Sequence, residues 1–63
     1  MHKHEIYSAA NATSMEARFL DGIMSTWVNR LKQFPELQRD LQKVSTHLQK
    51  IASELRKCAN KTE

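Results

Sequence analysis

The second half of the chain repeats apolar residues at alternating steps of three and four, the spacing of a helix that packs against another helix. We call six of these residues the heptad ladder: Leu37, Leu41, Val44, Leu48, Ile51 and Leu55. At about 100° per residue they project within a narrow stripe, the width of a contact with a single neighbouring helix. The ladder predicts a coiled-coil helix and indicates no chemistry by itself.

Length and composition restrict the fold further. A chain of 63 residues forms one domain at most, in the size range where a single hydrophobic core is marginal. Cys58 is the only cysteine, so no disulfide can form within the chain. One glycine, one proline and few aromatic residues leave a composition that favours helix. We therefore expect an all-α fold.

The start of the first helix is predicted by a capping signal. Thr13, followed three residues later by Glu16, fits the capping box, in which each side chain bonds to the other residue's backbone amide. Residues 1–12 show no sustained period. We expect a flexible N-terminal tail over residues 1–12 and a helical domain over residues 13–63.

Pro35 divides the helical part in two. Its ring and missing amide hydrogen exclude it from a helix interior, whereas the first turn of a new helix accepts it. The chain therefore turns back or kinks at this point, and we favour the turn, because the first helix is too apolar to stand alone. The predicted architecture is a two-helix hairpin, with helices at about 14–33 and 35–60. The second helix is the longer of the two and would overhang the first.

The two predicted helices have apolar faces of unequal width. Apolar residues of the first helix spread over roughly 200° of its surface, which the narrow ladder of the second cannot cover. An exposed apolar band of this kind is typical of an interface. We expect a partner to contact it, either a second copy that completes a helical bundle or another helical protein. The expected contact residues are Leu20, Met24, Trp27, Val28 and Leu31.

Basic residues offer an alternative function. The chain has a net charge of +3, and four cations share the side of the second helix opposite its ladder: Arg39, Lys43, Lys50 and Lys57. Such a ridge could contact phosphates, and the alternative is a small helical hairpin that regulates by binding nucleic acid. The ridge has no arginine cluster or interleaved aromatic residues, so we favour a solvated outer face as the explanation of the same residues.

Other classes of function find little support in the sequence. There is no nucleophile with a plausible base, no phosphate-binding glycine loop and no metal-ligand spacing, so we expect no enzyme, metal or cofactor. No apolar run is long enough to span a membrane and no signal peptide is evident, so we expect a cytoplasmic protein. The sequence favours a non-catalytic interaction module: a small adaptor, complex subunit or chaperone.

Overall fold

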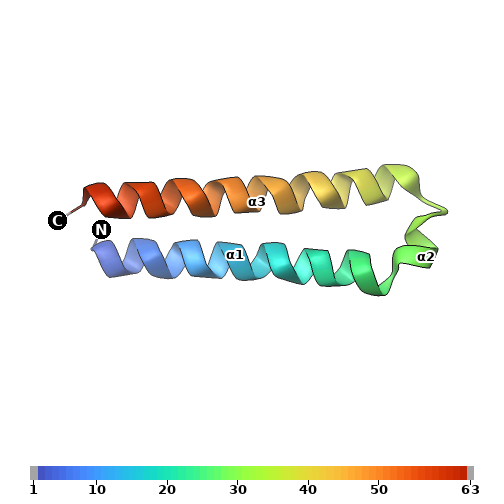
Figure 1. Cartoon of the computed structure of the whole chain (residues 1–63), viewed down its shortest axis with the longest axis horizontal. Helices are drawn as coiled ribbons and strands as arrows, with labels where there is room; N and C mark the ends of the chain where they lie inside the picture. The colour runs from blue at the N-terminus through green and yellow to red at the C-terminus, as the bar shows by residue number, and fades with distance from the viewer. Residues whose placement is uncertain (1, 63) are drawn as a thin grey trace.

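The computed structural model describes residues 2–62 and shows two long antiparallel helices side by side (Figure 1). Helix α1 spans Lys3–Thr26, the short helix α2 spans Val28–Leu31, and α3 spans Pro35–Lys61. The Cα positions extend over 48 × 16 × 12 Å, and both ends of the chain lie at the same end of the rod (Figure 1). The predicted all-α hairpin is confirmed.

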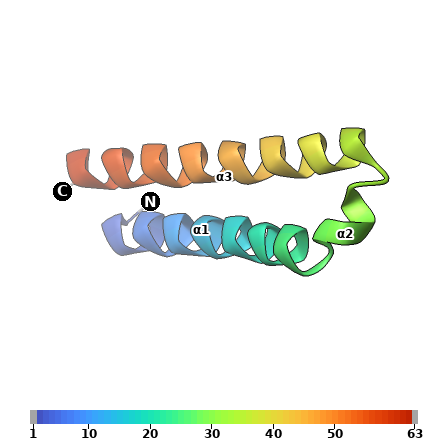
Figure 2. The same ribbon diagram turned by 45° about the vertical axis from the view of Figure 1, so that its right-hand side comes forward.

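The turn between the long helices contains two breaks. Trp27 leaves helical geometry with φ −104° and ψ 22°, and α2 then turns off the line of α1 toward α3 (Figure 2). Pro35 occupies the first turn of α3, where its missing amide hydrogen costs nothing. The chain turns back at Pro35, as predicted, and α3 ends within one residue of its expected limit. The first helix ends at Thr26, so the expected limit near residue 33 is wrong.

The predicted start of the first helix is also wrong. Helix α1 begins at Lys3, ten residues before the expected cap. Thr13 lies in the middle of α1, where its hydroxyl donates a 2.8 Å hydrogen bond to the carbonyl of Ala9. Ile6 and Ala10 of these added turns are buried. Helix α3, with 27 residues against 24 in α1, is the longer helix, as expected. The flexibility of residues 1–12 stays a prediction, but residues 3–12 are helical.

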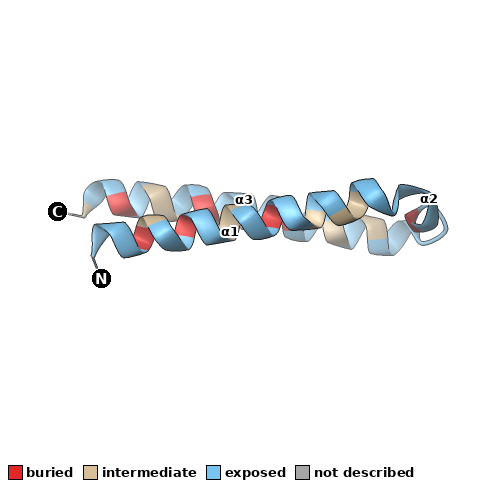
Figure 3. Ribbon diagram, turned by 90° about the horizontal axis from the view of Figure 1, so that it is seen from below, coloured by how far each residue is buried: buried red, intermediate tan, exposed pale blue. Residues whose placement is uncertain are grey.

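The two helices meet along a line of small residues, which we call the small-residue seam. Its members recur every seventh position and are almost fully buried: Ala10 and Ala17 on α1, and Ser45, Ala52 and Ala59 on α3 (Figure 3). Small side chains allow the two backbones to approach closely. The Oγ atom of Ser45 accordingly lies 3.4 Å from the backbone carbonyl oxygen of Ala17.

The heptad ladder does not form the centre of this contact. With 3.6 residues per turn, the middle of the ladder lies about 60° around α3 from its small-residue seam. Leu37 is 50% exposed and Val44 is 49% exposed, whereas the other four ladder residues are partly buried. The ladder therefore runs along one flank of the α1–α3 contact, with much of its surface still open.

Candidate functional site

One flank of the α1–α3 contact is polar and carries the hydrogen bonds that join the long helices. Near the open end of the hairpin, the Tyr7 hydroxyl donates a hydrogen bond to the side-chain oxygen of Asn60. In the middle, Arg56 donates to the Ser14 hydroxyl at 3.0 Å and to the side-chain oxygen of Asn11 at 3.4 Å.

Asp21 and Ser45 continue the polar flank toward the turn. Ser45 donates a 2.6 Å hydrogen bond to Asp21 Oδ1 from a fully buried position. Among the described residues, no buried side-chain nitrogen or oxygen lacks a hydrogen-bond partner. The cross-helix contacts also define the register: the two residue numbers add to 66 or 67 in Tyr7–Asn60, Arg56–Asn11 and Asp21–Ser45, and to 70 in Arg56–Ser14.

The opposite flank is apolar along α3 and, on α1, in the half nearer the turn. On α3 it consists of the heptad ladder, and on α1 it consists of Leu20, Ile23 and Trp27, which follow one another at steps of three and four. The polar residues of α1 and α3 bond to each other, so they lie on the same side of the hairpin. The apolar residues of the two helices lie across the small-residue seam from them and therefore share the other side. We call these nine residues the apolar face. Leu37, Val44 and Trp27 are each between 44% and 50% exposed, so the face is only partly covered within the chain.

The predicted contact residues of the first helix differ in their exposure to solvent. Leu20 and Met24 are partly buried, whereas Trp27 and Val28 are exposed at 44% and 39%. The guanidinium carbon of Arg30 lies 4.6 Å from the Trp27 ring centroid, a cation–π arrangement. Leu31 is only 7% exposed, because α2 turns it toward the interior, so it offers little surface to a partner. The role of these residues in binding stays a prediction.

Exposed apolar side chains also lie away from the apolar face: Phe34 in the turn is 58% exposed, and two others lie on the outer side of α1. Met15 is 68% exposed and Phe19 is 70% exposed, four residues apart on the side of α1 that faces away from α3. Gly22 is on the same side, and a Cβ added there would meet no atom within 4 Å. This outer side of α1 carries only two large apolar residues, whereas the apolar face carries nine.

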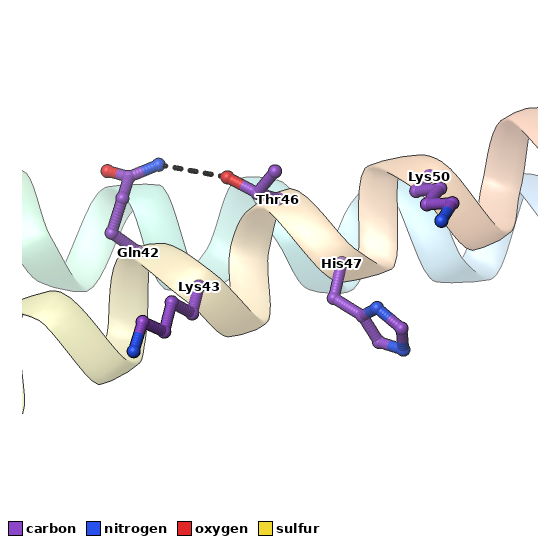
Figure 4. Close-up of a pocket in the computed structure, with 5 residues that line it drawn as sticks. All are labelled: Gln42, Lys43, Thr46, His47 and Lys50. Atoms are coloured by element: carbon purple, nitrogen blue, oxygen red, sulfur yellow. Dashed lines mark hydrogen bonds between the residues drawn. The ribbon is translucent and has the colours of Figure 1, made fainter.

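The four predicted anion-contact residues, Arg39, Lys43, Lys50 and Lys57, are all exposed on α3. Lys43 and Lys50 border a shallow depression of about 310 Å³, together with Gln42, Thr46 and His47 (Figure 4). Gln42 and Thr46 share a 3.4 Å hydrogen bond, and the lysine and histidine side chains spread apart over the helix surface (Figure 4). The five residues do not converge on one point, and anion binding stays a prediction.

Chemistry-bearing residues do not gather elsewhere in the part of the chain that the structure describes. Within residues 2–62, no three His, Cys, Asp or Glu side chains form a group that could hold a metal ion. Cys58 is a free, exposed thiol on α3. None of the helices in the same range combines the length and apolar character needed to cross a bilayer.

The sequence reasoning missed the small-residue seam, although a signal for it was present. Ser45, Ala52 and Ala59 are spaced by seven residues, and Ala10 and Ala17 have the same spacing. Helix periodicity is usually recognised from large apolar residues, so alanine and serine repeated at the same period are easily overlooked. The seam explains why the ladder is only partly covered, since α1 occupies the neighbouring stripe of α3.

Comparisons with known proteins identified no relative of this chain. A scan against family models, a search of curated proteins and a search of solved structures each found no match. The function is therefore inferred from the geometry of the hairpin.

Proposed function

We propose that this chain is a non-catalytic protein–protein interaction module that packs its apolar face onto helices of a partner. In this role it acts as a small adaptor, complex subunit or chaperone. The observation that carries the proposal is the separation of the two flanks: cross-helix hydrogen bonds lie on one flank, and nine large apolar residues lie on the other.

The heptad ladder supports a helical partner in particular. Its three–four spacing over 19 residues matches the knobs-into-holes packing of one helix along another. Helix α1 uses the small-residue seam of α3 instead, so the ladder stays available for a second helix. Leu37 and Val44 of this stripe are about half exposed, and apolar side chains left open along one stripe are typical of an interface.

Site-specific photo-crosslinking in living cells tests the proposal whatever the identity of the partner. A photoreactive amino acid replaces Val44 on the apolar face or, as the matched control, Thr46, which is exposed on the same helix outside this face. We expect discrete protein adducts from position 44, to a second copy or to another chain, and none from position 46. Equal labelling from both positions, or no protein adduct from position 44, would contradict the proposal.

A further inference from the structure

We propose that the turn of this hairpin docks on an anionic lipid surface, with its aromatic side chains in the headgroup region and its cations against lipid phosphates. The turn consists of α2 and the residues on either side of it, between Thr26 and Pro35, and it forms one end of the rod (Figure 1 and Figure 2). The inference goes beyond the proposed function, because it assigns a second kind of partner to the end of the hairpin.

Exposed apolar side chains are concentrated at the turn. Of the seven large apolar side chains that are exposed among the described residues, four lie within or beside it, and we call them the tip residues: Trp27, Val28, Phe34 and Leu37. Phe34 is the most exposed of the four, at 58%. Phe34 and Leu37 also border a shallow depression of about 410 Å³. Tryptophan, phenylalanine and leucine are the side chains that interfacial membrane-binding segments bury at the headgroup boundary.

The charges of the turn are cationic. Arg30 and Lys32 are both exposed, and the turn contains no aspartate or glutamate. The first carboxylate after the turn is Glu36, and Arg39 follows it, so residues 27–39 contain three cations and one carboxylate. An anionic membrane surface attracts each lysine or arginine that lies close to it. The turn therefore combines exposed aromatic side chains with a charge opposite to that of the lipid.

The backbone of the turn is suited to a surface with little water. The four consecutive amides of residues 31–34 donate hydrogen bonds of 2.9–3.2 Å to backbone carbonyls of residues 27–31. An amide without a partner is costly where water is excluded, as it is beneath the lipid headgroups. The turn can therefore enter the headgroup region with these amides already paired.

The position of the turn favours a lipid surface over a protein. The turn is the protruding end of a rod whose Cα positions measure only 16 × 12 Å across, so a protein partner would need a cavity shaped to receive it. A fluid bilayer surface adapts to a protruding end without such a match. A rod that stands on its turn also keeps both chain ends away from the membrane (Figure 1). Most of the heptad ladder then stays available for a partner helix.

The fluorescence of Trp27 tests the proposal without a label, because it is the only tryptophan in the chain. The full chain is titrated with vesicles of mixed phosphatidylserine and phosphatidylcholine, and separately with vesicles of phosphatidylcholine alone. We expect a blue shift with the mixed vesicles and binding about tenfold weaker, or less, to the neutral ones, because the cations lose their attraction to the surface. No shift with the mixed vesicles, or equal binding to both, would overturn the proposal.

Two matched substitutions test which apolar side chain enters the lipid. Phe34→Ser should weaken binding to the mixed vesicles about tenfold, because it removes apolar surface that the bilayer would bury. Phe19 is 70% exposed on the outer side of α1, so Phe19→Ser is the control and should change binding by no more than about twofold. Both side chains are exposed, so neither substitution removes a core contact. Equal weakening by the two would assign the contact to α1 and overturn the docking of the turn.

A matched pair of charge removals tests the cations. Arg30→Gln with Lys32→Gln should weaken cosedimentation with the mixed vesicles about tenfold. Lys50→Gln with Lys57→Gln removes the same charge more than about 20 Å along α3 from the turn, beyond the reach of the surface potential, and should have an effect of about twofold at most. Equal effects would show general attraction of a basic protein and overturn the proposal.

Crosslinking in cells separates a lipid surface from a protein at the same place. A photoreactive amino acid at position 34 should give lipid adducts. Discrete protein adducts in place of lipid would overturn the proposal and assign the turn to a protein partner. The proposed function is tested separately by the adducts from position 44, so either one can fail without the other.

Discussion

Ser45 of α3 donates a 2.6 Å hydrogen bond to Asp21 of α1 from a position with no solvent exposure. Its Oγ atom also lies 3.4 Å from the carbonyl oxygen of Ala17, so the serine fills the seam and ties the two helices at one level. This hydrogen bond joins one particular residue of α3 to one particular residue of α1, whereas alanine contacts alone would allow the two helices to shift along each other. This pair therefore contributes to the register on which the arrangement of both flanks depends.

The Ser45–Asp21 bond should appear as a coupling energy in a double-mutant cycle. Ser45→Ala and Asp21→Ala each remove the same hydrogen bond, so we expect a coupling of about 1–2 kcal/mol in urea denaturation. As a control, Ser45→Ala combined with Asp40→Ala should be additive within about 0.5 kcal/mol. Additivity in the first pair would show that the bond does not contribute to stability.

The small-residue seam should resist larger side chains. Ala17 is 1% exposed between the two helices, so Ala17→Leu should push the helices apart and lower the free energy of unfolding by about 1–3 kcal/mol. Ala12 is exposed on the same helix, so Ala12→Leu should change it by no more than about 0.5 kcal/mol. Circular dichroism during urea titration measures both, and equal effects would place the helix contact elsewhere.

The first turns of α1 should contribute to stability. Ile6 is 5% exposed against α3, so Ile6→Ala should cost about 2 kcal/mol or more through lost burial and the cavity left behind. The adjacent Glu5 is exposed, and Glu5→Ala serves as the control with an expected change below about 0.5 kcal/mol. If Ile6→Ala had no effect in the same titration, residues 3–12 would behave as a tail in solution.

Gly22 should be replaceable by alanine with a gain in stability. A Cβ at this position meets open space, and alanine is favoured over glycine within a helix by about 0.5–1 kcal/mol. Because Gly22 lies on the side of α1 away from the apolar face, Gly22→Ala should also leave the mass in sedimentation unchanged. A stable monomer produced by this substitution would instead assign the interface to the outer side of α1.

The second long helix was predictable from the sequence because local signals agree. Pro35 at its first turn, Glu36 near its start and Lys61 near its end all favour a helix over this range. The structure has α3 over Pro35–Lys61, close to the predicted range. The reversal at Pro35 was also predictable, because the first helix needs cover.

The first helix was less predictable because its limits depend on tertiary contacts. Thr13 and Glu16 match a capping box, but a threonine in a helix interior can bond to the carbonyl four residues earlier, as Thr13 does to Ala9. The preceding turns are helical because Ile6 and Ala10 pack against α3, a contact that no local pattern reports. At the other end, Trp27 breaks the helix where α2 turns toward α3.

The candidate site was predictable in part. The prediction of an exposed apolar band included Trp27 and Val28, and both are exposed. The prediction did not anticipate that the heptad ladder of α3 would itself stay partly exposed, because α1 packs on the small-residue seam beside it. Ladder residues such as Val44 therefore join Leu20 and Trp27 on one face, an arrangement that depends on the rotation of α3 about its own axis.

The most direct test of a covered apolar face compares Val44→Asp with Thr46→Asp in thermal unfolding at several protein concentrations. If another copy covers Val44, the melting temperature of the natural chain and of Thr46→Asp should rise with concentration. Val44→Asp should melt at a lower temperature that no longer depends on concentration, because a carboxylate there opposes the contact. If Val44→Asp instead melts with the natural chain at every concentration, Val44 faces water in the isolated protein, and coverage of the apolar face by a second copy is contradicted.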